Sequence, residues 1–504
     1  MAGPVNIVDL FSGPGGLSEG FAAAKVAGGE AAYKIGISIE KDKAAHRTLC
    51  LRAFLRKFRQ FPDEYYRWLE IGGDQPDWEE IYPDEWKIAS NEAICAELGL
   101  AETTAVLSSA ITEINRVAEG RTVLIGGPPC QAYSLVGRAR NRGKLDYVPS
   151  KDQRHYLYRE YCRVLSELSP AVFIMENVKG MLSSTVEGLA IFEQVVNDLK
   201  NSGSGYRLYA LSGDDSDEIL PYHFLLQAED YGVPQARHRV IIVGVRADVA
   251  SRLPRGFSPK LTKSERQVTV IDVLSNLPPL RSGLSRNDNP VAWQEAMAVA
   301  IAQVRRASSD YKGERPEAFH AALGEVEARL ASGTVSSRGS SIRTALPAAI
   351  PFKLRTFLND TRLAALHGHE TRGHMPSDLS RYLFAACYAS AEGSSPKASR
   401  FPSDIAPDHA NWTTGKFDDR FRVQRWQHPS STVTSHISKD GHYFIHPDPT
   451  QCRSLTVREA ARLQTFPDNY LFEGNRTQQY TQVGNAVPPF LAYQIAQVVG
   501  RVLQ

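Results

Sequence analysis

Two residues able to do covalent and acid–base chemistry each follow a short apolar run of the chain. Cys130 ends the stretch Gly-Gly-Pro-Pro-Cys that comes after the run 122–125, and Glu176 comes directly after the run 171–175. Such runs predict buried parallel strands, and open α/β sheets bind ligands at the carboxyl ends of their strands. A thiol and a carboxyl group at one sheet edge indicate covalent attack on an electron-poor ring, with the acid handling a ring proton.

Both residues also have an ordinary structural interpretation. A lone cysteine is usually buried in a core, and a single glutamate usually caps a helix or forms an ion pair. Pro128 and Pro129 cannot extend the strand, so they favour a rigid turn that holds Cys130 at the sheet edge. An acid placed immediately after an uninterrupted apolar strand likewise favours a functional role for Glu176.

A glycine-rich stretch at 11–16 follows the first predicted strand, 6–10, and opens a helix. Glycines there let the backbone approach a cofactor, and the helix start offers free amide groups. Glu40 follows the second predicted strand, 35–39, where an acid commonly binds ribose hydroxyls. The spacing is not GxGxxG and no basic group is evident for a pyrophosphate, so a nucleoside cofactor without phosphates fits better than a nicotinamide dinucleotide. The alternative is a glycine turn with a structural role only.

Polar and basic residues precede a later predicted strand at 240–243. Alternation along the chain puts Gln235, Arg237 and Arg239 on one face. This pattern is typical either of a solvated edge strand or of an arginine that reaches the site and holds a carbonyl oxygen.

Composition sets broad limits on the class of protein. The chain has 504 residues, of which 42% are hydrophobic, which is enough for a large core and two domains. Its formal net charge of +2 neither requires nor excludes a polyanionic partner. The six cysteines form no CxxC pair and no metal-ligand spacing. No signal peptide or long apolar span is evident, so we expect a soluble cytoplasmic protein with free thiols and no membrane association.

The pattern of apolar residues divides the chain into regions. From residue 5 to about 250, short apolar strands alternate with helical stretches, which predicts a parallel sheet, with a helical insertion at about 51–100. Proline, serine and glycine become frequent from about 251 to 450. Strong helical patterns return at 456–464 and 488–502.

Taken in series, the motifs resemble the sequence blocks of the cytosine-C5 DNA methyltransferase family, in the order which that family has. The matching stretches are 11–16 (cofactor loop), 40–42 (ribose-binding acid), 128–131 (nucleophile loop), 152–157 (a further cofactor block), 176–178, 235–239, 458–468 (which packs the recognition domain) and 482–489 (which folds back beside the first block).

The resemblance implies an α/β fold. Residues 1–250 would form a Rossmann-like catalytic core dependent on S-adenosylmethionine, with a mostly parallel sheet and helices on both faces. Residues 251–450 would form a smaller, irregular α+β target-recognition domain, and 451–504 a segment that returns to the catalytic domain. The product of the cofactor would be S-adenosylhomocysteine, and no metal is expected.

The resemblance also implies roles for individual residues. Cys130 would attack C6 of cytosine, Glu176 would bind N3, and Arg239 together with Arg237 would hold O2. Cofactor-binding roles fall on Phe11, Ser12, Gly13, Gly15, Gly16, Leu17, Glu40, Lys41, Pro128, Leu157, Asn485 and Ala486. DNA-binding roles fall on Gln131, Ser134, Arg138, Arg140, Arg142, Gln235, Thr432 and Val433. Because C6 is unreachable inside a duplex, the target base must be flipped out.

Two further stretches leave alternatives open. His367-Gly-His-Glu-Thr-Arg-Gly-His374 invites a metal interpretation, but its spacing is not HExxH and a polar loop or DNA contacts are favoured. The stretch 108–115 aligns with the family's third block, where an aspartate normally meets the adenine amino group. Ala110 stands at that position, so we expect weaker cofactor binding, a partner that completes the pocket, or replacement by Glu113.

The leading interpretation is a DNA methyltransferase of a bacterial restriction–modification or phage-defence system, acting as a monomer in the cytosol or nucleoid on double-stranded DNA. Its partners would include a restriction endonuclease or defence-system subunits. An RNA (tRNA) cytosine methyltransferase is one alternative, although the long region 251–450 favours duplex DNA. A non-catalytic DNA-binding subunit of the same fold is another, supported only by Ala110. A nicotinamide oxidoreductase is disfavoured by the glycine spacing and by the paired cysteine and glutamate.

Overall fold

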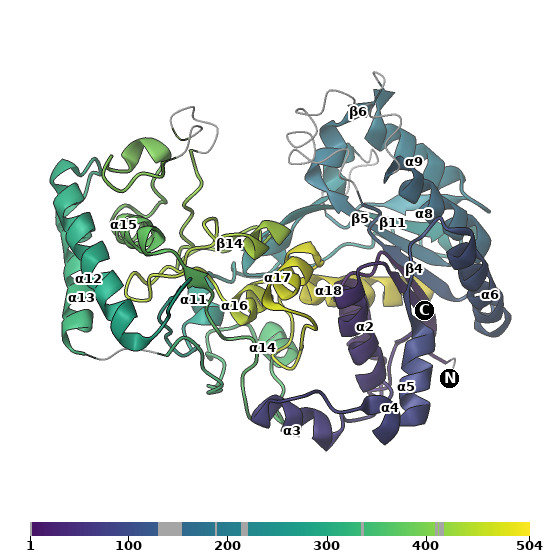
Figure 1. Cartoon of the computed structure of the whole chain (residues 1–504). Coiled ribbons are helices and arrows are strands. Elements are labelled where there is room, and N and C mark those ends of the chain that lie inside the picture. Colours follow the sequence, from purple (N-terminus) through teal and green to yellow (C-terminus); the bar gives the residue numbers. More distant parts are fainter. Residues whose placement is uncertain are drawn as a thin grey trace.

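The computed structural model describes residues 3–129, 154–186, 189–212, 220–333, 337–408, 412 and 418–504. These residues form two lobes joined by a central body of short helices (Figure 1). One lobe contains the main sheet, and the other, which we call the recognition lobe, contains a helical bundle from the irregular region of the sequence.

The main sheet is mostly parallel. Its parallel strands are β1 (Val5–Leu10), β2 (Tyr33–Glu40), β3 (Ala93–Cys95), β4 (Thr122–Gly126) and β5 (Val172–Val178). Its antiparallel strands are β8 (Tyr206–Tyr209), β9 (Leu225–Gln227) and β11 (His238–Arg246). The order is β3-β2-β1-β4-β5-β11-β8, with β9 paired to β11, so β1 and β4 lie at the centre.

Helices cover both faces of this sheet. Successive strand residues face opposite sides, so Ile7 enters one core and Val8 the other. The first face is covered by α1 (Gly16–Ala22) and α18 (Pro489–Leu503). The second face is covered by α6 (Ala101–Ala118), α8 (Arg154–Leu168) and α9 (Ile191–Asn201). This arrangement confirms the Rossmann-like fold predicted from the alternating pattern.

The predicted helical insertion is smaller than 51–100. Its helices are α3 (Asp63–Ile71), α4 (Trp78–Ile81) and α5 (Pro83–Glu92), preceded by α2 (Lys43–Leu55) of the sheet lobe. The aromatic rings of this stretch pack together in a hydrophobic cluster of their own. Residues 93–95 belong to the main sheet as β3, a strand too short to give a clear sequence pattern.

The recognition lobe has a separate hydrophobic core. Its main helices are α12 (Pro290–Ala307), α13 (Pro316–Ala331) and α15 (Pro376–Glu392), which pack on one another. Smaller elements of this region are α11 (Val270–Leu274), α14 (Phe352–Leu358) and the paired strands β12 (Gly283–Leu284) and β13 (Gly373–His374). The sheet lobe adds the hairpin of β6 (Thr185–Val186) and β7 (Leu189–Ala190), and α10 (Ala247–Ala250).

The central body joins the lobes. Strand β10 (Gln235–Ala236) pairs in parallel with β14 (Ser430–Ser431). Helix α16 (Val457–Leu463) begins at Thr456 with a capping box, and α17 (Arg476–Asn485) leads into α18, which runs back into the sheet lobe (Figure 1). The last segment of the chain therefore contributes to both the junction and the sheet lobe.

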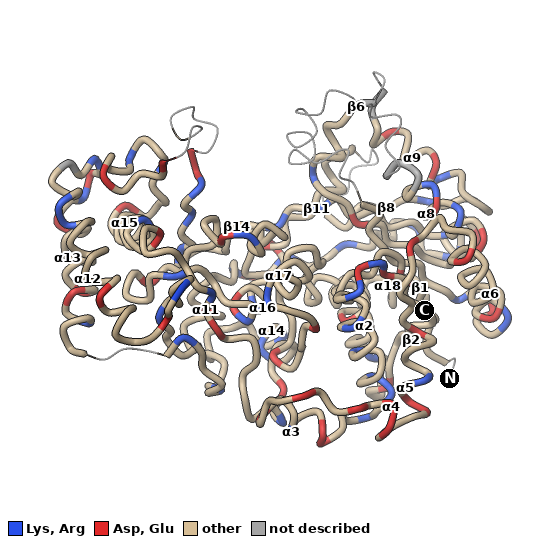
Figure 2. Tube along the Cα trace, viewed as in Figure 1, with Lys and Arg blue, Asp and Glu red and all other residues tan. Residues whose placement is uncertain are grey.

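Charged residues of both signs are interspersed over the two lobes in the view of Figure 2. A search of the described residues finds no helix that is long and apolar enough to cross a membrane.

Candidate active site

The glycine-rich loop lies between β1 and α1, beside Glu40 at the end of β2. The backbone amide of Gly13 donates to Glu40 Oε2 at 2.8 Å, and the amide of Asp42 donates to Oε1 at 2.7 Å. Burial raises the pKa of Glu40, while these backbone hydrogen bonds act to lower it. Each carboxylate oxygen has a further lone pair, so the group can still accept from hydroxyls. The structure therefore brings together the loop and the acid that the sequence predicts to share a ligand.

The three glycines of this loop meet different surroundings. A Cβ on Gly16 would lie 2.2 Å from the carbonyl oxygen of Val487, and one on Gly15 would lie 3.2 Å from the hydroxyl of Tyr470. A Cβ on Gly13 would have nothing within 4 Å. Gly16 is thus required by packing against the last segment of the chain, and Gly15 by its φ of +92°, whereas Gly13, with φ +56°, faces open space where a ligand can lie.

Tyr470 was not predicted as part of this region. Its buried hydroxyl donates a hydrogen bond to the carbonyl oxygen of Pro14 within the loop. The guanidinium of Arg52 lies 4.4 Å from the centre of the Tyr470 ring and pairs with Glu19 of α1. Because the partners are distant in sequence, no local pattern could have identified this support of the loop.

The end of β3 corrects the prediction made for Ala110. Ala110 lies in the middle of α6, and the neighbouring Glu113 is exposed and paired with Arg116. The carboxyl end of β3 instead leads into Ala96 and Glu97, and Cys95 aligns with Glu40 across the β2–β3 ladder. Glu97 forms an ion pair with Lys41, at 3.2 Å between Oε1 and Nζ, and both side chains are about half exposed. The acidic residue that follows β3 at this edge of the sheet is therefore Glu97.

The nucleophile loop begins at the end of β4. Pro128 is buried, and its carbonyl oxygen accepts a hydrogen bond from Asn177 Nδ2 at 3.3 Å. A Cβ on Gly127 would lie 2.8 Å from Glu176 Oε2, so a larger residue here would displace that carboxylate from its present position. Cys130 lies outside the described residues, as do Gln131, Ser134, Arg138, Arg140 and Arg142. The described part of the loop therefore places Glu176 against the residues that lead directly to Cys130.

Glu176 lies within β5 rather than after it, because the strand continues to Val178. Its Oε1 lies 2.8 Å from Nε of Arg239, and each of the two side chains is 15% exposed. The pairing arises from the antiparallel register, in which Arg239 opposes Val178 and Ile241 opposes Glu176. The carboxyl group and the guanidinium together form a half-buried pair of complementary charge, suited to bind a planar polar ring.

The side chain of Arg237 does not lie in the site, where the sequence predicts it. Its guanidinium is buried and donates to the carbonyl oxygens of Val433, at 2.8 Å, and Gly484, at 3.3 Å. Burial lowers the pKa of Arg237 well below its usual value. The regular alternation fails because the chain leaves β10 at Ala236 and begins β11 only at His238. Arg237 therefore holds the junction of the two lobes together, and Arg239 alone meets Glu176.

The same junction contains three residues predicted to contact DNA, of which two are buried and Thr432 is partly exposed. Gln235 donates through Nε2 to the carbonyl oxygen of Leu463 and accepts from the amide of Val433, and both Gln235 and Val433 are fully buried. The hydroxyl of Thr432 donates to the carbonyl oxygen of Ala236 at 2.5 Å. These side chains connect β10 to β14, so the structure gives them a place in the junction instead of on an open surface.

The remaining predicted cofactor residues vary in exposure. Leu17, Leu157 and Ala486 are buried, and Leu157 packs from α8 into the core on that face of the sheet. Asn485, in contrast, is exposed at the end of α17. Phe11 and Ser12 are partly exposed at the end of β1, and the Ser12 hydroxyl donates to the carbonyl oxygen of Asp9 at 3.0 Å. Asn485 and Ser12 thus retain polar atoms at the surface of the loop region.

The histidine-rich stretch is dispersed. His367 bonds the carbonyl oxygen of Leu69, His369 bonds that of Pro278 at 2.8 Å, and His374 contacts Ser454. Each imidazole ring thus forms a hydrogen bond with a different part of the chain. In the described part of the chain, no group of three or more potential ligand side chains is placed to hold a metal.

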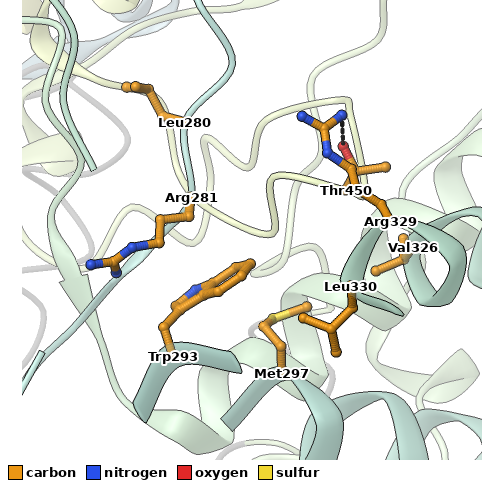
Figure 3. A pocket seen from close by; sticks show the side chains of 8 residues that line it. All are labelled: Leu280, Arg281, Trp293, Met297, Val326, Arg329, Leu330 and Thr450. Atoms are coloured by element: carbon orange, nitrogen blue, oxygen red, sulfur yellow. Dashed lines mark hydrogen bonds between the residues drawn. The ribbon is translucent and has the colours of Figure 1, made fainter. Parts of the chain in front are cut away.

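A small cavity in the recognition lobe lies between α12 and α13 (Figure 3). Trp293 and Met297 face Val326 and Leu330 across it, and Arg329 donates to the hydroxyl of Thr450 at 3.2 Å (Figure 3). Its volume is about 20 Å³, room for about one water molecule. It is a packing gap of the helical bundle, in the lobe opposite to β5 (Figure 1).

Comparison with known proteins gives consistent matches along the chain. The family model described as C-5 cytosine-specific DNA methylase matches residues 108–501. The Type II methyltransferase M.Bpa9945I of Bacillus paralicheniformis is 32% identical, over 99% of both chains. M.AgeI of Thalassovita gelatinovora, also a Type II methyltransferase, is 28% identical over 98% of both chains.

One solved structure has a similar fold. It is described as a DNA modification methyltransferase encoded within a prophage of E. coli, and its TM-score is 0.52 at 20% identity, over 99% of both chains.

Proposed function

The chain belongs to the C-5 cytosine-specific DNA methylase family, and from that premise we propose that it methylates C5 of a cytosine flipped out of duplex DNA, with S-adenosylmethionine as methyl donor. The observation that carries this proposal is the position of Glu176. Its carboxylate contacts Arg239 on one side and Gly127 on the other, three residues before Cys130. A nucleophile, an acid and a cation would thereby surround one small planar ring.

The residues of the loop region fit the cofactor. Gly13 borders open space, Glu40 can accept from ribose hydroxyls, and Glu97 offers an acceptor for the amino group of adenine. When bound, S-adenosylmethionine supplies an electrophilic methyl group on its sulfonium sulfur. The exposed amide of Asn485 is a further candidate to bind the amino-acid part of the cofactor.

The side chains of the site would activate the base. The thiolate of Cys130 adds to C6, which moves electron density to C5. Glu176 donates a proton or hydrogen bond to N3 while Arg239 donates to O2, and both stabilise the charge that develops on the ring. Once C5 carries the methyl group, a base such as water removes the C5 proton, and the cysteine sulfur leaves to restore the ring.

A mechanism-based trap tests this proposal. Duplex DNA containing 5-fluorocytosine cannot lose fluorine from C5, so incubation with S-adenosylmethionine should leave the protein covalently joined to DNA after denaturation. The Cys130→Ala variant should form no adduct, whereas Cys95→Ser, which removes an exposed thiol, should form it normally. Absence of an adduct on a pool of mixed sequences would refute the catalytic proposal.

The relatives named above are Type II methyltransferases, and we infer a role for this chain in restriction–modification, with a restriction endonuclease as its partner. Bisulfite sequencing of DNA from expressing cells should reveal one short methylated sequence. Equal or preferred transfer of radiolabelled methyl groups to tRNA would instead place the chain among RNA methyltransferases.

A further inference from the structure

The insertion helix α3 contacts an irregular segment that leads toward the recognition lobe, residues 359–369. In Figure 1, α3 lies at the lower edge of the molecule, below α14 and between the two lobes. Leu363 is 2% exposed and packs in the aromatic cluster of the insertion, whereas Leu358 and Leu366 on either side of it pack in the core of the central body. This burial shows that the segment and the insertion form one continuous hydrophobic unit.

Polar contacts reinforce the same interface. The hydroxyl of Tyr66 donates to Asp360 Oδ2 at 2.6 Å. Arg362 donates to the carbonyl oxygen of Phe61 at 2.7 Å, pairs with Asp63, and holds its guanidinium 4.4 Å from the centre of the Tyr66 ring. Tyr66 and Arg362 therefore form the centre of the contact, each making more than one interaction.

The segment is held from its other side by the end of the chain. Asn469 Nδ2 donates to the same Asp360 Oδ2, also at 2.6 Å. The carbonyl oxygen of Asn469 accepts from the hydroxyl of Tyr65 at 2.7 Å, and the next residue, Tyr470, supports the glycine-rich loop. Asp360 thus lies where the insertion, the cofactor-binding side of the core and the recognition segment meet.

From this point the segment runs directly into the recognition lobe. His369 bonds the carbonyl oxygen of Pro278, and β13 pairs with β12 before α15 begins. A displacement of residues 359–367 would therefore be transmitted to the lobe through short, hydrogen-bonded connections and no long loop.

We propose that α3 is a brace that fixes the recognition lobe relative to the sheet lobe, and so holds the two lobes in the arrangement that binds duplex DNA. The first half of this proposal is independent of the catalytic activity, and the second half rests on the proposed function. In Figure 1, α3 lies at the lower edge of the molecule, well away from β5, which carries Glu176, so it would restrain the lobes without touching that residue.

The test uses a double variant, Tyr66→Phe with Arg362→Ala, and a matched control, Tyr82→Phe. The Tyr82 hydroxyl donates to Glu64 Oε2 at 2.9 Å, inside the insertion and away from the recognition segment. Spin labels at positions 117 of α6 and 299 of α12, exposed by 54% and 57%, report the distance between the lobes. Cys95, Cys130 and Cys162 are replaced by serine in this background, and thermal melting verifies that each variant is folded.

We expect the double variant to broaden the distribution of interlabel distances and to bind a labelled mixed-sequence duplex about threefold to tenfold more weakly. The control should match the parent protein in both measurements. An unchanged distance distribution in the double variant overturns the brace, and a broadened one with unchanged DNA affinity overturns its effect on DNA binding. If the parent protein binds no duplex DNA, the proposed function is refuted. The interlabel distances of the double variant would still show whether α3 acts as a brace.

Discussion

Glu176 and Arg239 form an ion pair across the antiparallel ladder of β5 and β11, with 2.8 Å between Oε1 and Nε. The pair is possible because the mostly parallel sheet becomes antiparallel at this point, which brings the start of β11 to the end of β5. Arg239, which follows the parallel strands in the sequence, thus completes a site at the carboxyl ends of the central strands.

Substitution by methionine should affect mainly methyl transfer at Arg239 and mainly stability at Arg237. Arg239→Met should reduce methyl transfer by about a hundredfold or more, because a donor to the developing charge is lost. Its melting temperature should fall less than that of Arg237→Met, because the Glu176 carboxylate left without its partner keeps 15% of its surface in water, whereas Arg237 is only 2% exposed. Transfer of radiolabelled methyl groups under single-turnover conditions, together with calorimetric melting, measures both effects.

Arg237→Met should instead lower the free energy of unfolding by about 2 kcal/mol, because the carbonyl oxygens of Val433 and Gly484 lose a buried donor. Loss of transfer in Arg237→Met with unchanged stability would contradict the structural role assigned here and return Arg237 to the catalytic group.

Glu97 should contribute to cofactor binding. Glu97→Ala should weaken the affinity for S-adenosylmethionine about tenfold, equivalent to about 1.4 kcal/mol, because the adenine amino group would lose its acceptor. Glu113→Ala is the control, since that side chain lies exposed on α6 and pairs with Arg116. Isothermal titration calorimetry separates the two variants, and equal affinities would exclude Glu97 from the pocket.

Tyr470 should support the cofactor loop specifically. Tyr470→Phe leaves the carbonyl oxygen of Pro14 without its donor, and we expect a loss of about 1 kcal/mol in stability and a severalfold weaker binding of S-adenosylmethionine. Tyr480→Phe removes a comparable buried hydrogen bond, to the carbonyl oxygen of Leu455 at 2.6 Å. That variant should lose similar stability but bind the cofactor normally, and weakened binding in both would indicate a general loss of structure.

Buried histidines should make the protein sensitive to mild acid. Burial lowers the pKa of His369 to about 4 and those of His374 and His446 to about 3. Below about pH 6.5 the unfolded chain binds protons on these residues while the folded protein does not, so stability falls with pH. We expect a loss of about 1 kcal/mol per histidine at pH 5.5. The measurement is urea unfolding at pH 7.5, 6.5 and 5.5.

Asp9 acts in the opposite sense, because burial raises the pKa of its carboxyl group to about 7. Its unfolded form ionises from about pH 4, so this residue costs stability as pH rises toward 7. The dependence on pH should therefore be steeper in Asp9→Asn and shallower in His374→Gln than in the parent protein. A stability that is constant or higher at pH 5.5 would contradict the dominance of the histidines.

The sequence was sufficient to predict the long strands of the main sheet and their motifs, because runs such as 122–125 combine uninterrupted apolar residues with clear boundaries. The sequence is insufficient at β3, whose three residues give no periodic signal, so the motif pattern points to α6 for the missing acid. It also fails at Arg237, whose partner Val433 lies 196 residues away. Local patterns carry no information about such contacts, so they predict DNA contacts for the buried junction residues Gln235 and Val433.

Tyr470 and Pro14 are 456 positions apart in the sequence, and Gly16 packs against Val487. During translation the glycine-rich loop leaves the ribosome long before its supports are made. A polypeptide that stops after β11 would hence carry the motifs of the sheet and still lack the finished loop. Methylating ability should be acquired only once Tyr470 and Val487 have been added, and a protease that removes α18 would abolish it without cutting near Cys130.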